Sequence, residues 1–268
     1  MCELFAMSSL YPASISFSLE EFSRHGGLSG PHKDGWGIAY YENLDVRLFR
    51  EPNSASDSPC IEFIRDQRYP SKLVISHIRK ATMGEISLRN TQPFCREAGG
   101  RMHLFAHNGD LPGIDAQPLV QLGDHRPIGS TDSEYAFCHL MRCLQPVWRP
   151  QAAPDLATRY RVIDEFAALI RPIGPANFIY SDGEYIFVHG HVRTQPGREG
   201  FYPPGLYWLC RSCTPSHTPV EIPGIEMEYQ GPPQKAALIA TVPLTDEKWQ
   251  PLGEGELLVF KNGERVVP

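Results

Sequence analysis

Short apolar runs that predict β-strands outnumber helical stretches in this sequence, and most of them come in neighbouring pairs. Residues 36–41 and 46–50 form one such pair; residues 177–180 and 185–188 form another, joined by an Asp-Gly turn at 182–183. Hairpin-paired strands build antiparallel sheets, whereas a doubly wound parallel sheet requires strands and helices to alternate. The pattern therefore predicts an α+β fold with antiparallel sheets. Further expected strands are residues 2–8, 73–78, 102–106, 206–210, 236–242 and 257–261.

Helical stretches are fewer, and one of them has a clear start signal. Thr131 followed by Glu134 forms a capping-box pattern, and apolar residues continue at helical spacing to Leu144. No internal repeat or convincing linker divides the chain, so we expect a single domain over residues 2–268. The proline-rich stretch 146–154 is a candidate boundary, but a connection between two helices explains it equally well. The other expected helices are residues 19–24, 59–68 and 156–170.

The composition is ordinary for a globular protein and argues against several kinds of partner. Of 268 residues, 41% are apolar and 21% are charged, which allows a sizeable core. A net charge of −6 argues against nucleic acid or an anionic membrane as the main partner. No apolar run approaches the ~20 residues of a membrane span, and we expect no signal peptide. Seven cysteines without a framework pattern indicate reduced thiols and a cytoplasmic location.

The second residue of the chain, Cys2, is the first candidate for chemistry. If a processing enzyme removes Met1, a thiol and a free α-amine lie on the same residue. A free α-amine titrates near ~7.7–8 and a thiol near ~8.5, so proton transfer between them costs little at neutral pH. Cys2 would then be a nucleophile that carries its own base, although a cysteine near the start of a chain proves nothing alone.

Three further candidates each have an ordinary structural interpretation beside a functional one. Asn108-Gly109 after an apolar strand is most simply a type I′ hairpin turn, but a side-chain amide and a glycine N–H also suit an oxyanion hole. Asp132 lies in the first turn of a helix, where carboxylates are favoured, and would also neutralise an ammonium group. Arg79 leaves a buried strand, where it is either solvated or a bidentate partner for a carboxylate.

Other motifs carry weaker signals. Residues 34–37 (Asp-Gly-Trp-Gly) are either a turn into a strand or a wall against which another backbone packs closely. Cys210 and Cys213 have the spacing of a redox pair or half a zinc site, but no second such pair accompanies them. His189 and His191 lack an evident acidic or cysteine partner for a metal. We therefore expect neither a metal nor a cofactor.

Taken in order, five of these motifs resemble the class II glutamine amidotransferases. The resemblance covers about the first 145 residues in motif form, and the C-terminal part looks like the stand-alone bacterial branch often called YafJ-type. It implies an N-terminal-nucleophile (Ntn) hydrolase with a four-layer αββα fold. The motifs are Cys2, residues 34–37 (Asp-Gly-Trp-Gly), 77–82 (His-Ile-Arg-Lys-Ala-Thr), 107–109 (His-Asn-Gly) and 131–134 (Thr-Asp-Ser-Glu).

The resemblance also implies a role for each matching residue. Cys2 would be the nucleophile, and its freed amine the base. Asn108 and Gly109 would form the oxyanion hole. Arg79, with Thr82 nearby, would hold the α-carboxylate of glutamine, and Asp132 would hold the α-ammonium group. Attack on the side-chain amide would release ammonia and leave a γ-glutamyl thioester, which water would hydrolyse to glutamate.

Three positions depart from the family pattern. His25-Gly26 stands where many members have Arg-Gly, and Gln92 stands where an Asn-x-His-Pro motif is expected to have its histidine. Lys80 follows Arg79 where many synthase-linked members have tryptophan. Because the nucleophile, oxyanion and head-group positions are intact, these changes put the surface facing an acceptor or synthase in doubt more than the hydrolysis.

We therefore expect a cytoplasmic hydrolase that acts on glutamine or on another γ-glutamyl amide. The length leaves no room for a synthase domain, so either ammonia passes to a separate synthase subunit or the protein is a γ-glutamyl amidohydrolase. Association with a synthase subunit and assembly into a homo-oligomer are the two alternatives for its protein partners. Two rivals remain: a non-catalytic glutamine-binding regulator, which needs only Arg79 and Asp132, and a thiol redox or metal protein that uses Cys210 and Cys213.

Overall fold

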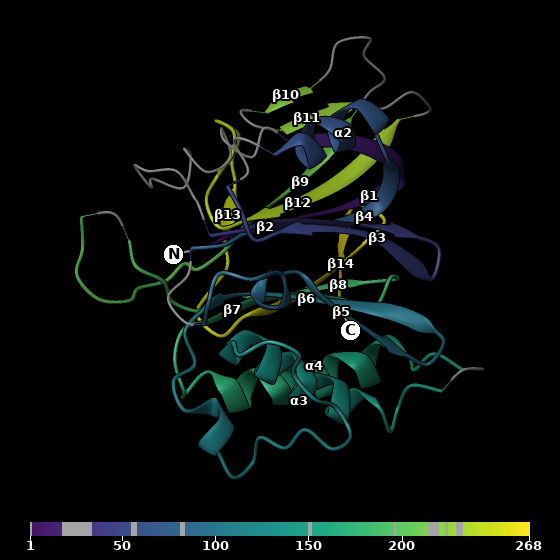
Figure 1. The fold of residues 1–268 in the computed structure, drawn as a ribbon. Coiled ribbons are helices and arrows are strands. Elements are labelled where there is room, and N and C mark those ends of the chain that lie inside the picture. Colours follow the sequence, from purple (N-terminus) through teal and green to yellow (C-terminus); the bar gives the residue numbers. More distant parts are fainter. Residues whose placement is uncertain are drawn as a thin grey trace.

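The computed structural model contains two antiparallel sheets that lie face to face (Figure 1). Helices α3 (Asp132–Leu144) and α4 (Leu156–Ile170) cover the outer face of one sheet, and α2 (Pro59–Gln67) packs on the outer face of the other. This α+β arrangement confirms the expected fold class. The structure describes residues 2–17, 34–54, 58–80, 84–149, 152–195, 197–213, 220–222, 225–228 and 233–268, so the helix expected at 19–24 lies outside the described residues.

The first sheet, sheet A, places strand β1 between β12 and β4. Its strand order is β13-β9-β12-β1-β4-β2-β3, with β11 also paired to β1 and β10 paired to β11. The strands are β1 (Glu3–Phe17), β2 (Trp36–Glu42), β3 (Asp45–Glu51), β4 (Pro70–Ile78), β9 (Tyr207–Cys213), β10 (Val220–Ile222), β11 (Ile225–Glu228), β12 (Gln234–Ala240) and β13 (Gln250–Pro251).

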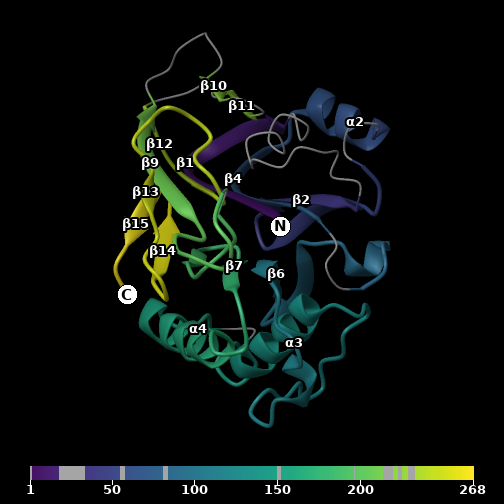
Figure 2. The same cartoon turned by 90° about the vertical axis from the view of Figure 1, so that its left-hand side faces the viewer.

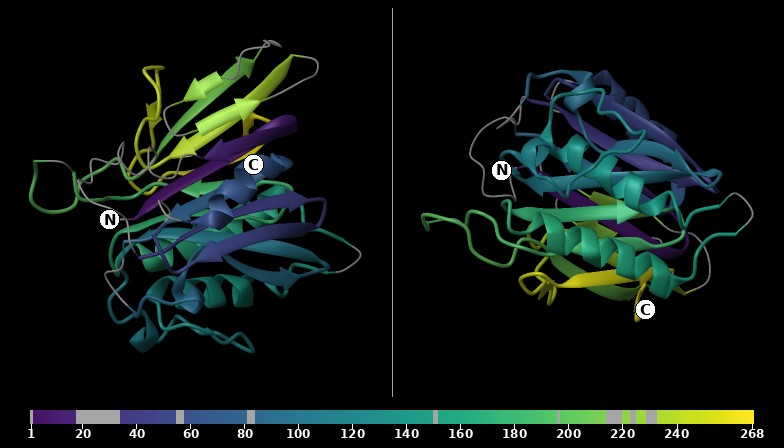
Figure 3. Two further views of the ribbon diagram at one scale, coloured as in Figure 1. Left: turned by 45° about the horizontal axis from the view of Figure 1, so that its top comes forward. Right: turned by 90° about the horizontal axis from the view of Figure 1, so that it is seen from below.

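The second sheet, sheet B, lies below sheet A in the view of Figure 1 and has the order β15-β14-β8-β7-β6-β5. Seen from below, α3 and α4 run across its outer face (Figure 3). Two short 3₁₀ helices, η2 (Leu88–Asn90) and η3 (Ile114–Ala116), lie in the loops on either side of β5 and β6. The strands are β5 (Phe94–Ala98), β6 (Arg101–Gly109), β7 (Ala176–Ser181), β8 (Ile186–His189), β14 (Leu257–Lys261) and β15 (Glu264–Val266).

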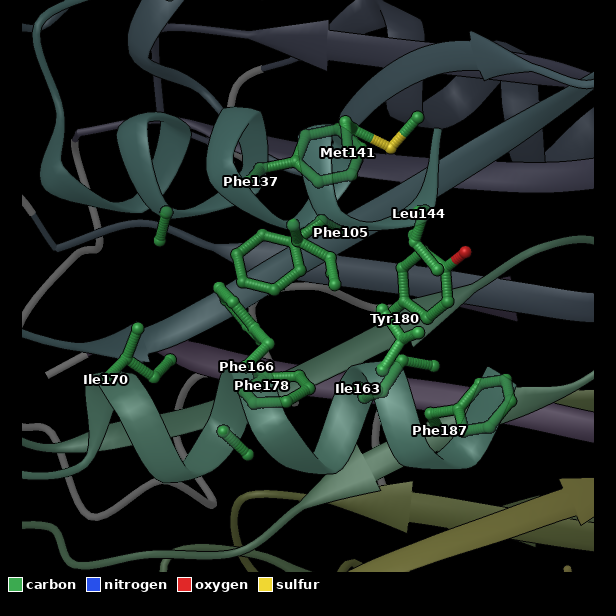
Figure 4. Packing of buried hydrophobic residues seen from close by; sticks show 14 of the residues in the cluster. Phe105, Phe137, Met141, Leu144, Ile163, Phe166, Ile170, Phe178, Tyr180 and Phe187 are labelled. Carbon is green, nitrogen blue, oxygen red and sulfur yellow. The ribbon is translucent and has the colours of Figure 1, made fainter. Parts of the chain in front are cut away.

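Inner strands such as β2, β7 and β8 are buried on both faces, which explains why they form continuous apolar runs in the sequence rather than alternating ones. Along β1, Leu4 and Ala6 belong to the cluster between the sheets, whereas Phe5 and Met7 belong to the cluster on the outer face of sheet A. A third cluster joins sheet B to α3 and α4 (Figure 4). In that cluster the rings of Phe105 and Phe137 stack with centroids 5.3 Å apart.

The helix signals at the start of α3 are half confirmed. The Thr131 hydroxyl accepts a hydrogen bond from the Glu134 N–H at 3.2 Å, as a capping box requires. The Glu134 carboxylate does not complete the box among the described contacts, because it accepts instead from the N–H groups of Ile128 and Gly129 and pairs with Arg96. The proline-rich stretch 146–154 connects α3 to α4. Within the described residues, no helix is long and apolar enough to cross a membrane.

The glycines at 34–37 serve as the wall that their spacing suggested. A Cβ on Gly37 would lie 2.2 Å from the carbonyl oxygen of Gln92, so glycine lets the 91–93 backbone pack directly on β2. Trp36 is fully buried in the outer-face cluster of sheet A. Gly35 has φ +127°, which lets the chain turn into β2, and its carbonyl accepts the Arg79 N–H at 2.8 Å.

A buried polar group holds the start of β1. The Thr241 hydroxyl accepts the Leu4 N–H at 2.7 Å, and the Glu3 carboxylate lies 3.5 Å from the Arg193 guanidinium, which also donates to the Thr241 carbonyl. Glu3 is 1% exposed, and its second carboxylate oxygen has no partner among the described residues. Burial therefore raises the pKa of Glu3 to about 7, although the Arg193 charge opposes this rise.

We expect Gly37→Ala to destabilise the fold by about 1–3 kcal/mol or more, since the added methyl group collides with backbone that cannot rotate away. Chemical denaturation measures this loss. Gly253→Ala is the matched control: its Cβ would meet nothing closer than 3.5 Å, and no positive φ strains it. Equal stabilities of the two variants would contradict the close packing of residues 91–93 on β2.

The Glu3 carboxyl should make stability depend on pH near neutrality. Between about pH 4.5 and pH 7 the folded state keeps a proton that the unfolded state has lost, so the free energy of unfolding falls as the pH rises. The loss amounts to at most about 3 kcal/mol above pH 7. Glu3→Gln should flatten this decline when denaturation is measured at pH 5, 6, 7 and 8, whereas the exposed control Asp66→Asn should leave it unchanged. If the free energy of unfolding of Glu3→Gln fell with rising pH as steeply as that of the parent protein, the assignment of this decline to Glu3 would be wrong.

Candidate active site

Cys2 lies at the start of β1, between the two sheets at one end of the sandwich (Figures 1 and 2). Side chains alternate along a strand, so Cys2 shares the inter-sheet face with Leu4 and Ala6. Its sulfur is 3.3 Å from the Lys80 nitrogen and 3.4 Å from the Lys80 carbonyl oxygen. Burial raises the pKa of the Cys2 thiol, and the Lys80 N–H opposes this rise. The site therefore holds a largely protonated thiol beside a donor suited to a thiolate.

Asn108 comes from sheet B and contacts the same residue. Its Nδ2 atom donates to the Cys2 carbonyl oxygen at 2.6 Å, and its side chain is buried. The hairpin-turn interpretation of Asn108-Gly109 is wrong, because both residues extend β6 and pair with Asn177 and Ala176 of β7. Neither has the positive φ that a type I′ turn requires.

Gly109 ends β6 where no side chain fits. A Cβ there would lie 1.7 Å from the Pro175 carbonyl oxygen and 2.8 Å from Nε2 of His107. Glycine therefore lets the chain leave the sheet next to Asn108 with its backbone close to neighbouring groups. The amide of Asn108 and the backbone of Gly109 are thus neighbours at the strand end nearest to Cys2.

Arg79 extends the chain beyond the end of β4 at Ile78, directly before Lys80. The interpretation of Arg79 as a solvated residue is wrong, since it is 3% exposed. Its guanidinium donates to the carbonyl oxygens of Gly84 and Glu85 at 3.3 and 3.1 Å. These bonds orient a planar cation next to the cysteine segment. Thr82, like His25 and Gly26, lies outside the described residues.

Asp132 is the first residue of α3, and both of its carboxylate oxygens accept backbone N–H groups. The donors are Ser133 at 2.8 Å and Leu111, two residues past Gly109, at 2.6 Å. Asp132 therefore occupies the helix start as one interpretation expected, and its bond with Leu111 also ties the carboxylate to the loop after β6. Asp132 remains partly exposed, so an additional cation has access to it.

Asp110 is a neighbouring carboxyl that sequence reasoning missed. Partial burial and the negative charge of Asp132 raise its pKa, and one of its oxygens is buried without a partner among the described residues. The neighbouring carboxyl groups of Asp110 and Asp132 favour the binding of a positively charged group. The sequence signal that could have identified Asp110 is its position directly after the His-Asn-Gly motif.

The histidines near Cys2 are not arranged as general bases. Burial, reinforced by the Arg79 charge, lowers the pKa of His77 to about 3, so its imidazole is neutral and weakly basic. His107 is held between the Ser133 hydroxyl at 2.9 Å and the Pro175 carbonyl at 3.2 Å, and burial lowers its pKa. Neither imidazole has a described contact with the Cys2 sulfur.

The weaker motifs do not join this site. His189 and His191 both bond the backbone of Ala176, at 2.7 and 3.2 Å, and thus support β7. In the described part of the chain, no group of three or more His, Cys, Asp or Glu side chains has a metal-binding arrangement. Cys210 is a free, exposed thiol on β9, and the side chain of Cys213 lies outside the described part.

Comparisons with known proteins identify the family of the chain. A family model for class II glutamine amidotransferases matches residues 1–267. The YafJ protein of Escherichia coli (strain K12) is 36% identical over 271 residues, which cover the whole of both chains. A predicted glutamine amidotransferase from Pseudomonas aeruginosa, seen in a crystal structure, matches over the full length of both chains with a TM-score of 0.72 and 31% identity.

More distant structures share the fold alone. Glutamine phosphoribosylpyrophosphate amidotransferase from Bacillus subtilis matches 99% of this chain and 48% of its own, with a TM-score of 0.60 and 14% identity. The two antiparallel sheets are thus those of an Ntn-hydrolase amidotransferase fold. The match over nearly the whole chain confirms the resemblance drawn from five motifs. The protein belongs to the class II glutamine amidotransferases, a family of enzymes that hydrolyse or transfer the side-chain amide of glutamine.

Proposed function

We propose that this enzyme cleaves the γ-amide of glutamine, or of a related γ-glutamyl amide, with Cys2 as the nucleophile. The observation that carries the proposal is a pair of hydrogen bonds at Cys2. Its sulfur accepts the Lys80 N–H, and its carbonyl accepts the Asn108 side-chain amide. Because a nucleophile must lie beside the group that stabilises the developing charge, the nucleophile and the oxyanion donor share one place here. Pure binding of glutamine would require neither Cys2 nor Asn108.

The base in this proposal is the α-amine of Cys2, exposed by removal of Met1. Desolvation raises the pKa of the Cys2 thiol, which therefore needs a base, while burial lowers the pKa of both His77 and His107, and neither imidazole has a described contact with the sulfur. An amine on the same residue is always within reach of the thiol, and its ordinary pKa lies near ~8. This geometry favours the amine as the group that takes the thiol proton.

The Asn108 amide has the donor capacity that the reaction needs. A carboxamide nitrogen carries two hydrogens, and the Cys2 carbonyl occupies one of them. We assign the second hydrogen, together with the Gly109 N–H, to the oxygen of the substrate amide. Attack forms the S–C bond and an oxyanion; the oxyanion then collapses, the C–N bond breaks, and ammonia leaves with the proton returned by the α-ammonium group. Water then hydrolyses the thioester to glutamate.

We assign recognition of the substrate head group to charges on either side of Cys2. Arg79, with Thr82, would bind the α-carboxylate through the planar guanidinium. Asp132 would bind the α-ammonium group. Burial and the charge of Asp132 raise the pKa of neighbouring Asp110, and a bound cation would relieve the repulsion between these two carboxyl groups. Opposite charges at both α-groups would select free glutamine and γ-glutamyl compounds over other amides.

The fate of the amine separates two versions of the proposal. Ammonia passes to an acceptor on a separate synthase subunit, or the protein is an amidohydrolase for one γ-glutamyl metabolite. We further propose that residues 2–268 act as one domain in the cytoplasm and bind neither nucleic acid nor membrane. Incubation of purified protein with a panel of γ-glutamyl compounds, followed by mass spectrometry, distinguishes the versions: release of a specific amine faster than ammonia from glutamine identifies the amidohydrolase.

Replacement of the nucleophile should abolish turnover. We expect Cys2→Ala to release no ammonia from glutamine, and Asn108→Ala to lower kcat by about 10²–10³-fold with a much smaller change in KM. Coupled assays of glutamate and ammonia measure both. Cys210→Ala is the matched control and should retain full activity, and intact-mass measurement of the active protein should show loss of Met1. Retained turnover in Cys2→Ala, or an active chain that keeps Met1, would contradict the mechanism.

The head-group contacts give a separate prediction. Glutamine analogues that lack the α-carboxylate or the α-ammonium group should be poor substrates, and Arg79→Lys and Asp132→Asn should raise KM for glutamine about tenfold or more, because each removes roughly 1.5–3 kcal/mol of charged hydrogen bonding. Steady-state kinetics measures the effect. Arg89→Lys alters an exposed arginine of the same loop region and should change nothing. Equal rates for complete and truncated analogues would reject this pocket.

A further inference from the structure

Asn177 lies directly opposite Asn108 in the β6–β7 pair. It is fully buried, and it shares the inter-sheet face of β7 with Ile179, because residues two apart on a strand face the same side. A buried carboxamide in a layer that is otherwise apolar is costly unless its hydrogen-bonding groups are satisfied. Each polar group of the Asn177 carboxamide therefore needs a hydrogen-bonding partner.

The Asn177 carboxamide uses both of its hydrogens and its oxygen. Nδ2 donates to the Asn108 carbonyl at 3.1 Å and to the Val192 carbonyl at 2.8 Å, while Oδ1 accepts the His191 N–H at 2.7 Å. The reverse orientation would point oxygen at two carbonyls and nitrogen at a donor, so one orientation is imposed. A Cβ on Gly205 would lie 1.6 Å from Oδ1, so glycine makes room for the amide.

These hydrogen bonds belong to a continuous network of contacts around the site. The Asn108 side chain binds the Cys2 carbonyl, and the Asn108 carbonyl binds Asn177, which in turn holds the backbone at His191 and Val192. The next residue along the chain, Arg193, lies against Glu3, the neighbour of Cys2. This network thus joins the start of β1 to the end of β6 through a third segment, residues 191–193.

We propose that Asn177 is a positioning residue for the oxyanion hole. It does not touch the substrate; it holds the Asn108 backbone so that the free hydrogen of the Asn108 amide points where the oxyanion forms. Such a donor helps only when it is already in place, and small displacements weaken it strongly. The inference rests on the proposed function, because it takes Asn108 as the oxyanion donor.

The test compares Asn177→Ala with Asp182→Ala. Asp182 is also fully buried and hydrogen-bonded, directly after the other end of β7, roughly 16 Å away at 3.3 Å per residue. Both variants should lose thermal stability. Only Asn177→Ala should lower kcat for glutamine, by about 10–100-fold with KM within about twofold, and it should leave the rate of Cys2 alkylation by iodoacetamide unchanged. Asn177→Ser, which keeps one donor, is the milder variant if Asn177→Ala does not fold, and should show an intermediate loss.

A second measurement is independent of turnover. The side-chain amide of Asn108, followed by ¹⁵N nuclear magnetic resonance in labelled protein, should shift or broaden in Asn177→Ala or Asn177→Ser and stay unchanged in Asp182→Ala. If the parent protein releases no glutamate, the proposed function fails. The Asn108 resonance would still show whether Asn177 positions the Asn108 side chain. Equal kcat losses in the Asn177 and Asp182 variants, or an unperturbed Asn108 signal in the Asn177 variant, would overturn the inference.

Discussion

The site depends on the two-sided hydrogen bonding of strand β1. β12 pairs with one side of this strand and β4 with the other, and the Thr241 hydroxyl adds a bond at Leu4. A strand held on both sides has little freedom at its end. The first residues of the chain, which usually fray, are thereby ordered up to Cys2, and the cysteine is presented to groups from the opposite sheet.

Burial sets the electrostatics of this place. It raises the pKa of the Cys2 thiol and keeps His77 neutral, so the thiol proton has to pass to another group. The same burial strengthens each directed dipole, because little water screens it. Arg79 and Asp132 each have their orientation set by contacts with the backbone.

Local patterns predicted most long elements but missed short or irregular ones. β5 (Phe94–Ala98) is polar along half its length and pairs only with β6, so no apolar run marked it. The strand expected at residues 2–8 continues to Phe17, because the pairing with β4 shifts register between Ser8 and Ala13 and then resumes. Helix α2 was expected at residues 59–68 from its helical spacing, and the structure adds a cap by the Ser58 side chain and a proline at the helix start.

The sequence by itself indicated the α+β fold class through local periodicity, and the order of its five motifs gave the family resemblance from which the roles of the candidate site residues were inferred. Tertiary structure alone decided that Asn108 extends a strand rather than turning, and that Arg79 is buried. It also decided which residues support the site. Asn177 and Arg193 lie far along the chain from Cys2, and no local pattern encodes contacts that form only when two sheets pack face to face.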